Sequence, residues 1–119
     1  MLYCAATASL CALETLAHSG GLPTGMIVIE AQVPDALPMQ ILRDVDLPVD
    51  WNASVAPGAT KDPGTEWAAE KSTAILSVPS ALVPSERNYL LNPSHPDFER
   101  IVFDPPQPFV FDSRLKKAM

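Results

Sequence analysis

The sequence contains few basic residues and no long apolar run. Of its 119 residues, 8 are Lys or Arg and 14 are Asp or Glu, which gives a formal net charge of −6. Lys116-Lys117 is the single adjacent basic pair, so the basic stripe that binds nucleic acid is missing. No apolar run approaches the about 18 residues of a membrane span. We therefore expect neither nucleic-acid binding nor membrane insertion.

Cysteine is also scarce, with Cys4 and Cys11 the only two. Their spacing matches no common zinc motif, so we expect no metal and interpret both as buried free thiols. The N-terminal stretch is apolar but lacks a basic region, and Glu14 and His18 interrupt it, which argues against a signal peptide. These absences predict a cytoplasmic protein with reduced cysteines.

Several catalytic motifs are missing. The chain has neither a Gly-x-Gly-x-x-Gly fingerprint nor a P-loop, which excludes the common nucleotide-binding sites. It also has no Gly-x-Ser-x-Gly turn, and neither His18 nor His95 lies in a triad context, so a serine hydrolase is not indicated. We interpret His95 as a loop residue that forms hydrogen bonds.

The residues that are present predict a single α+β domain over 1–119. Apolar residues make up 47% and charged residues 18%, as in globular proteins, and 13 prolines favour short strands. Thr7 can cap one amphipathic helix over 8–18, which Gly20-Gly21 ends. Mostly antiparallel strands are expected at 2–4, 26–33, 72–78, 100–104 and 108–112. We expect the last two to pair as a hairpin through Pro105-Pro106.

Two segments do not fit this pattern of one helix and short strands. Residues 34–66 are expected to be irregular, with Trp51 and Trp67 anchoring them on the core, apart from helical turns near 66–70. Residues 85–98, "SERNYLLNPSHPDF", read as a rigid loop framed by prolines around an apolar centre, because Pro93 and Pro96 weaken any strand there.

Glu14 is the most informative residue of the predicted helix. At about 100° per residue it falls within the apolar arc around Leu10. A carboxylate on the core side of a helix needs a partner or a pocket, because burial of a lone charge is costly. One alternative is an edge position that reaches solvent or an arginine. The other is a carboxylate that faces a cleft, where it could stabilise a positive charge or orient a hydroxyl.

Three segments together resemble the RES domain, the toxin half of RES–Xre toxin–antitoxin modules. They are "LYCAATASLCALETLAH", "STAILSVPSALVPSERNYLLNPSHPDF" and "PFVFDSRL". The resemblance implies a fold similar to ADP-ribosyltransferases and an enzyme that cleaves the nicotinamide–ribose bond of NAD+. It implies phosphate as the acceptor, a protein target in some relatives, no prosthetic group, and an Xre-type antitoxin as partner.

The resemblance also assigns roles to residues. Glu14 would stabilise the cationic transition state or hold a ribose hydroxyl, and Tyr3 would stack on nicotinamide or ribose. Ser72 would form a hydrogen bond to the ribose or the amide. Ser80 and Asn92 would shape the wall of the binding pocket. Taken alone, Tyr3 can also be a core aromatic residue, and the serines can be caps or turn residues.

Two departures from the family pattern lead to further expectations. RES domains carry an arginine-bearing segment before the position of Tyr3, and Ser77 stands where the family often has arginine. We expect an N-terminally truncated domain with a weakened grip on the NAD+ diphosphate. An open sheet edge would then favour self-association. The alternative function is an inactive RES remnant that only binds protein, either the antitoxin or itself.

Overall fold

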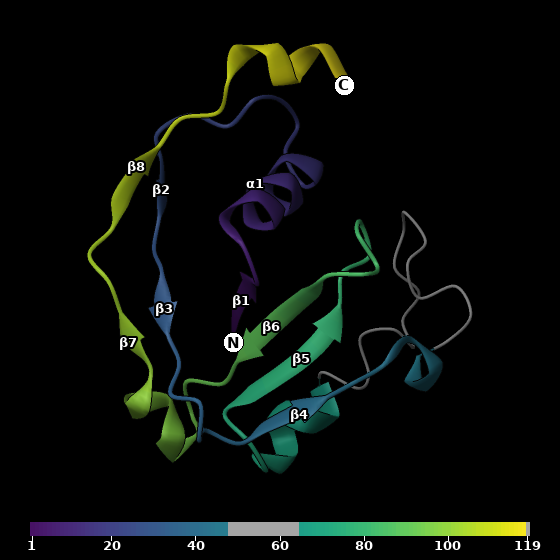
Figure 1. Ribbon diagram of the computed structural model, residues 1–119, viewed down its shortest axis with the longest axis vertical. Helices are drawn as coiled ribbons and strands as arrows, with labels where there is room; N and C mark the ends of the chain where they lie inside the picture. Colours follow the sequence, from purple (N-terminus) through teal and green to yellow (C-terminus); the bar gives the residue numbers. More distant parts are fainter. Residues whose placement is uncertain (48–64, 119) are drawn as a thin grey trace.

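The structure of the chain is a computed structural model that describes residues 1–47 and 65–118. A four-stranded sheet, one main helix and a long two-stranded arm form the described part (Figure 1). The predicted α+β class, with short and mostly antiparallel strands, is confirmed. Among the described residues, no helix has the length and apolar character needed to cross a membrane.

The sheet has the strand order β1-β6-β5-β4. Its strands are β1 (Leu2–Ala5), β4 (Met39–Ile41), β5 (Ile75–Pro79) and β6 (Arg87–Leu91). β6 pairs antiparallel with β1 and with β5, whereas β4 runs parallel to β5. The expectation that 34–66 is irregular is therefore wrong for β4, and residues 48–64, with Trp51, lie outside the described part. β4 forms because it adds hydrogen bonds to the buried strand β5.

Strand β6 corrects the interpretation of residues 85–98. The expected rigid loop is instead a strand in the middle of the sheet, followed by a turn and the 3-10 helix η2 (Pro96–Arg100). The prolines do not prevent it because Pro93 and Pro96 come after its last residue. His95 caps η2, and its Nδ1 accepts a hydrogen bond from the backbone N–H of Asp97 at 3.0 Å, which confirms it as a loop hydrogen-bonder.

Helix α1 (Ala8–Ala17) follows β1 directly, and the predicted cap Thr7 is in place. A shorter helix over 65–70 leads into β5 and carries Trp67, which is 1% exposed. The Trp67 Nε1–H donates to Thr73 Oγ1 at 2.9 Å, so Trp67 is a packed core residue. That it anchors the stretch before it stays a prediction. The strand predicted at 72–78 begins only at Ile75, because the turn after this helix occupies the preceding residues.

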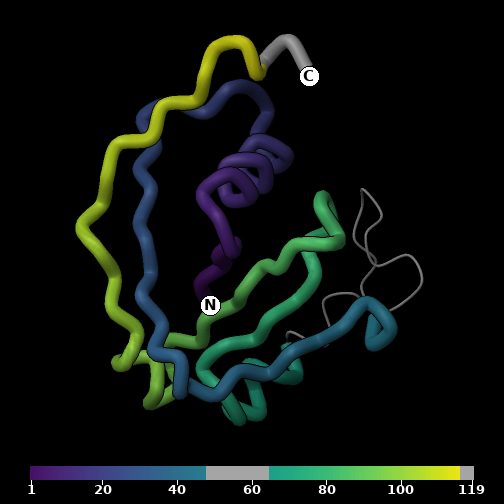
Figure 2. Tube along the Cα trace, in the orientation of Figure 1, coloured from purple at the N-terminus to yellow at the C-terminus, as the bar shows by residue number. Residues whose placement is uncertain are grey.

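The arm is an antiparallel ribbon on one side of the molecule (Figures 1 and 2). It consists of β2 (Met26–Val28) with β8 (Gln107–Phe109), and β3 (Ala31–Gln32) with β7 (Val102–Phe103). The predicted hairpin between 100–104 and 108–112 is wrong, since these strands pair with β3 and β2. The ribbon is interrupted between its two strand pairs at Pro105 and Pro106, because proline has no N–H to donate to a strand ladder. Three residues, 104–106, lie there opposite the two residues Ile29 and Glu30.

The hydrophobic core lies between the sheet and the base of the arm. Its buried members are Leu37, Ala74, Ile75, Leu91 and Ile101. Ile75 and Leu91 are opposite each other on β5 and β6 and point to the same face. Helix α1 covers the opposite face of the sheet. A C-terminal 3-10 helix, η3 (Ser113–Ala118), follows the arm.

Candidate functional site

Helix α1 presents Glu14 to the sheet. Leu10 and Glu14 are its two buried residues, and they lie four positions apart on one face. Leu10 is 2% exposed and Glu14 is 9% exposed. The helix starts at this register because Thr7 Oγ1 accepts a hydrogen bond from the Leu10 N–H at 3.1 Å. The prediction that Glu14 faces the core side is confirmed, and within the described residues it pairs with no basic side chain.

The partner of Glu14 is Asn88, on the face of β6 that α1 covers. Asn88 is 0% exposed, and its Nδ2 donates a hydrogen bond to Glu14 Oε2. The same Nδ2 donates to the hydroxyl of Tyr3 at 3.1 Å. One side-chain amide therefore joins a carboxylate from α1 to a phenol from β1. We call these three residues, Tyr3, Glu14 and Asn88, the β1–α1–β6 cluster.

Tyr3 is the solvent-facing member of the cluster. The residue is 60% exposed on edge strand β1, while its hydroxyl turns toward the fully buried Asn88. Burial of the hydroxyl raises the pKa of Tyr3 above 10.0, the nearby Glu14 carboxylate raises the pKa further, and the Asn88 hydrogen bond opposes both effects. Tyr3 therefore keeps its proton at neutral pH. Because it accepts from Asn88, its own O–H is available to a ligand.

Asn88 was missed by the sequence reasoning because residues 85–98 were interpreted as a loop. Once Arg87–Leu91 is a strand, alternation puts Asn88 and Leu90 on one face and Tyr89 and Leu91 on the other. A polar residue in the middle of a central strand needs a partner. That is the signal that could have identified Asn88.

Ser72 does not join the cluster in this structure. It is an exposed residue of the turn before β5, whereas Asn88 is opposite Val78 near the other end of that strand. The strand from Ile75 to Val78 alone spans about 10 Å. The role of Ser72 in binding ribose stays a prediction.

Ser80 and Asn92 are both buried, and the side chains of both form hydrogen bonds with backbone groups. Ser80 Oγ accepts hydrogen bonds from the N–H groups of Leu82 and Val83 at 3.2 and 3.1 Å. The Asn92 side chain donates to Ala68 O at 3.3 Å and accepts from the Ser94 N–H at 3.0 Å. These bonds hold the segments at the ends of β5 and β6, and neither side chain forms a hydrogen bond with the β1–α1–β6 cluster.

A cavity of about 1310 Å³ lies between β1 and the arm, and Tyr3 lines it. Cys4 and Cys11 line it too as free thiols. Cys11 is exposed and Cys4 is half-buried, so the expectation of buried thiols is wrong for both. Its charged lining residues are Glu30, Asp35 and Asp104. No Lys or Arg of the described chain lines it. The described residues thus provide no positive charge for a diphosphate at this place.

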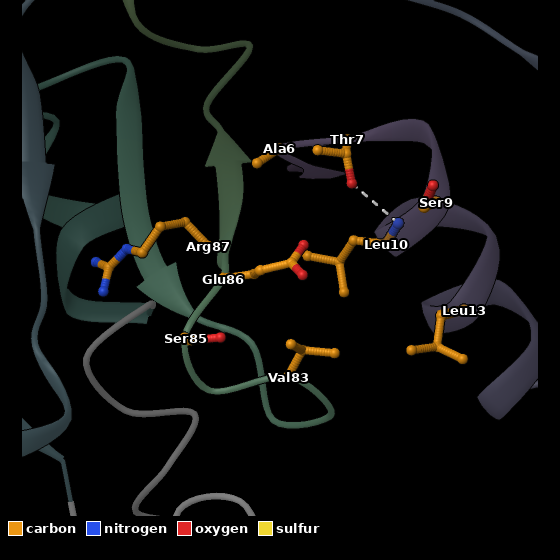
Figure 3. Close-up of a pocket in the computed structure, with 9 residues that line it drawn as sticks. All are labelled: Ala6, Thr7, Ser9, Leu10, Leu13, Val83, Ser85, Glu86 and Arg87. Atoms are coloured by element: carbon orange, nitrogen blue, oxygen red, sulfur yellow. Dashed lines mark hydrogen bonds between the residues drawn. The ribbon is translucent and has the colours of Figure 1, made fainter.

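A second, smaller cavity of about 610 Å³ separates the start of α1 from residues 83–87 (Figure 3). Leu10 and Leu13 face it from the helix, and Glu86 points toward the helix from the opposite wall. The Arg87 side chain points away, where it donates to Ser77 Oγ at 2.9 Å. Glu14 lines neither of the two cavities. Tyr3 alone connects the cluster to the larger cavity.

The fold and the cluster define a small α+β domain with a buried carboxylate and a protonated phenol side by side at a sheet edge. Such a pair can stabilise a developing positive charge and donate a hydrogen bond to the same ligand. The chain belongs to the RES domain family, whose domain matches residues 1–112. The resemblance drawn from the sequence is therefore confirmed.

Longer relatives match nearly the whole chain, which spans about three quarters of their length. A protein named Toxin Res from Yersinia enterocolitica is 40% identical over 118 residues, which covers 97% of this chain and 77% of the relative. Toxin Res from Photorhabdus laumondii is 40% identical over 122 residues, covering 98% and 76%. A protein named Prs ADP-ribosylating toxin from Sphingobium is 37% identical over 119 residues, covering 97% and 74%.

Proposed function

We propose that this protein is a RES-family toxin that cleaves the nicotinamide–ribose bond of NAD+. The observation that supports this most is the nearly buried Glu14 carboxylate, held by Asn88 beside the hydroxyl of Tyr3. A carboxylate with little exposure acts on a nearby positive charge more strongly than one in water. The names of the relatives, which are toxins, support the same class of function.

The bond to be broken joins the ribose carbon C1 to the positively charged nicotinamide nitrogen. Both bonding electrons leave with the nitrogen, so nicotinamide departs neutral and the ribose becomes oxocarbenium-like. Glu14 would stabilise this cation. A phosphate oxygen then forms the new bond to C1, which gives ADP-ribose 1-phosphate. No redox partner is required, since nicotinamide is released without a change of oxidation state.

Tyr3 would contact the nicotinamide or the ribose from the solvent side of the cluster. Its raised pKa keeps the hydroxyl protonated, so it can donate a hydrogen bond while its ring offers a stacking surface. Ser72 stays a proposed contact to the ribose. Ser80 and Asn92 would support the site by fixing the turns around it.

The acceptor distinguishes two forms of this activity. Phosphate is the acceptor we propose first. The name of the Sphingobium relative, an ADP-ribosylating toxin, supports a second form in which a side chain of a target protein attacks C1 instead. Release of nicotinamide is common to both forms, and the fate of the ribose separates them.

The proposed partners follow from the family. We propose an Xre-type antitoxin that neutralises the enzyme in the cytoplasm, and NAD+ as a substrate without any resident cofactor. We also propose self-association through β1, which is at the edge of the four-stranded sheet and exposes Leu2. A protein that only binds an antitoxin or itself is the alternative.

The test measures nicotinamide release from NAD+ by the purified chain, with and without phosphate, and with a cell extract as the source of protein acceptors. Mass spectrometry identifies the ribose product. We compare Glu14→Gln, which keeps the shape and removes the charge, with Glu70→Gln, which alters an exposed carboxylate outside the cluster. Glu14→Gln is expected to lower the rate by about 100-fold or more.

Each outcome separates the alternatives. Ribose phosphate formation supports the phosphorylase form, and labelled protein supports the transferase form. If the wild-type chain and Glu14→Gln both release nicotinamide only at the background rate, the enzymatic proposal fails for this chain and the binding module remains. Equal release above background would remove Glu14 from the catalytic role.

A further inference from the structure

We infer that Asn88 is a positioning residue that fixes Glu14 and Tyr3 relative to each other. This inference deepens the proposed function and rests on it for its catalytic meaning. The geometry that carries it is independent of any reaction. The Nδ2 group of Asn88 is the only described donor that contacts both the Glu14 carboxylate and the Tyr3 hydroxyl.

The location of Asn88 makes it rigid. It lies on central strand β6, where it is opposite Ala5 of β1 and Val78 of β5. The backbone on both sides is held by strand pairing, and the side chain is fully buried. A side chain with so little freedom can set the position of two others.

The orientation of the amide is also fixed. Its Oδ1 is buried and has no hydrogen-bond partner among the described residues. A flip of the amide would turn this oxygen toward the Glu14 carboxylate, where two acceptors would repel each other. The amide therefore keeps both N–H groups on its two acceptors and leaves Oδ1 unpaired. An unpaired buried acceptor is costly, and such groups persist where another requirement determines the side chain.

Two other buried polar residues show the contrast. Asn92 is buried as Asn88 is, but within the described part of the chain its side chain bonds only to backbone groups. Over the same residues, the Ser80 hydroxyl accepts only from backbone N–H groups. The Asn88 side chain instead bonds to two described side chains, and both belong to the candidate site. A role limited to holding turns does not explain this choice of partners.

For the site, the consequence is that Asn88 couples the Glu14 carboxylate to the Tyr3 hydroxyl. With the amide in place, the Glu14 charge acts on the Tyr3 hydroxyl at a fixed distance, and the raised pKa of Tyr3 reflects burial together with this charge. The Tyr3 hydroxyl keeps its proton and stays available as a donor. Without the amide, the Glu14 carboxylate loses its hydrogen-bond donor and Tyr3 on its edge strand is free to turn away.

The first test measures this coupling without substrate. The sequence has two tyrosines, so Tyr89→Phe leaves Tyr3 as the single phenol whose ionisation is followed by ultraviolet absorbance. In that background, Glu14→Gln is expected to lower the ionisation midpoint of Tyr3, since a negative charge is removed. In Asn88→Leu, which has similar volume and no donor, the same Glu14→Gln change should leave the midpoint unmoved.

The result that would overturn the inference is a Glu14→Gln shift of equal size with and without Asn88. A midpoint that does not respond to Glu14→Gln in either background would also overturn it. Asn88→Ser serves as a second, smaller variant in case Asn88→Leu does not fold. If neither variant unfolds cooperatively, Asn88 belongs to the fold and the inference is wrong.

The second test applies to the enzyme. We expect Asn88→Leu or Asn88→Ser to lower kcat for nicotinamide release by about 100-fold, with KM for NAD+ changed far less, because the reacting groups are misplaced and binding persists. Thr73→Val is the control, because it removes a partly buried hydroxyl that bonds to Trp67 and Ile75 outside the cluster; it should leave kcat of the folded protein unchanged. Equal losses in the Asn88 and Thr73 variants would assign Asn88 a general structural role. If the wild-type chain releases no nicotinamide, the proposed function fails while the titration still decides the inference.

Discussion

Buried polar side chains have different hydrogen-bond partners on the α1 side of the sheet and at the ends of β5 and β6. At the strand ends, Ser80 and Asn92 bond to backbone groups and hold turns. Under α1, Glu14 and Asn88 bond to other side chains, and Asn88 also reaches Tyr3. Burial alone does not separate the two regions, because all four residues are buried. The identity of the partners does, and it distinguishes a stabilising region from a candidate site.

The largest expected effect is a loss of stability from disrupted packing of α1 against the sheet. Leu10 is buried next to Glu14 on the same helix face, whereas Leu13 is 43% exposed. Leu10→Ala should lower the free energy of unfolding by about 2–5 kcal/mol, because it leaves a cavity between α1 and the sheet. Urea unfolding followed by circular dichroism measures this. Leu13→Ala is the matched control, and an equal loss in both variants would show that α1 does not pack as described.

A second prediction concerns the strand ends. Asn92→Ala removes the donor to Ala68 O and the acceptor of the Ser94 N–H. It should lower the free energy of unfolding by about 1–3 kcal/mol while the rate of nicotinamide release per folded molecule stays the same. Chemical unfolding and single-turnover kinetics give the two values. A fall in rate with intact stability would place Asn92 in the site and remove the contrast between the regions.

A third prediction sharpens the boundary of the site. Ser72 is exposed and lies at the other end of β5 from the cluster. We expect Ser72→Ala to change KM for NAD+ by only a few-fold, roughly the effect of one neutral hydrogen bond, and to leave kcat intact. Steady-state kinetics beside Tyr3→Phe checks this. A loss of kcat as large as that of Glu14→Gln would show that Ser72 reaches the reacting atoms.

The smallest expected effect is a pH dependence of stability. The pKa of Tyr3 is raised above 10.0 in the folded chain, so the folded state binds the phenolic proton more tightly than the unfolded state does. This contribution is fully present below about pH 10 and is lost as pH rises through the folded pKa. Thermal unfolding between neutral pH and pH 11 should show a steeper alkaline loss in the wild type than in Tyr3→Phe. Parallel curves would show that burial and the Glu14 charge together do not raise the pKa of Tyr3 in the folded chain.

Local chemistry allowed part of the structure to be predicted. Thr7 and the apolar periodicity place α1 within one residue of its observed end, because capping and amphipathicity depend on neighbours along the chain. The inward direction of Glu14 follows from the same periodicity. The pairing of β7 and β8 was predicted wrongly, since two adjacent strands form a hairpin by default and only the distant strands β2 and β3 offer better partners here.

The sequence by itself determined the α+β class, the position of α1, and the family to which the chain belongs. These depend on periodicity, caps and residue patterns that are local or that recur in relatives. The tertiary structure alone decided that Arg87–Leu91 is the central strand and that Asn88 joins Tyr3 to Glu14. These contacts connect residues 74 and 85 positions apart. Hydrogen bonding at such separations is set by strand register and helix packing, which no short stretch of sequence specifies.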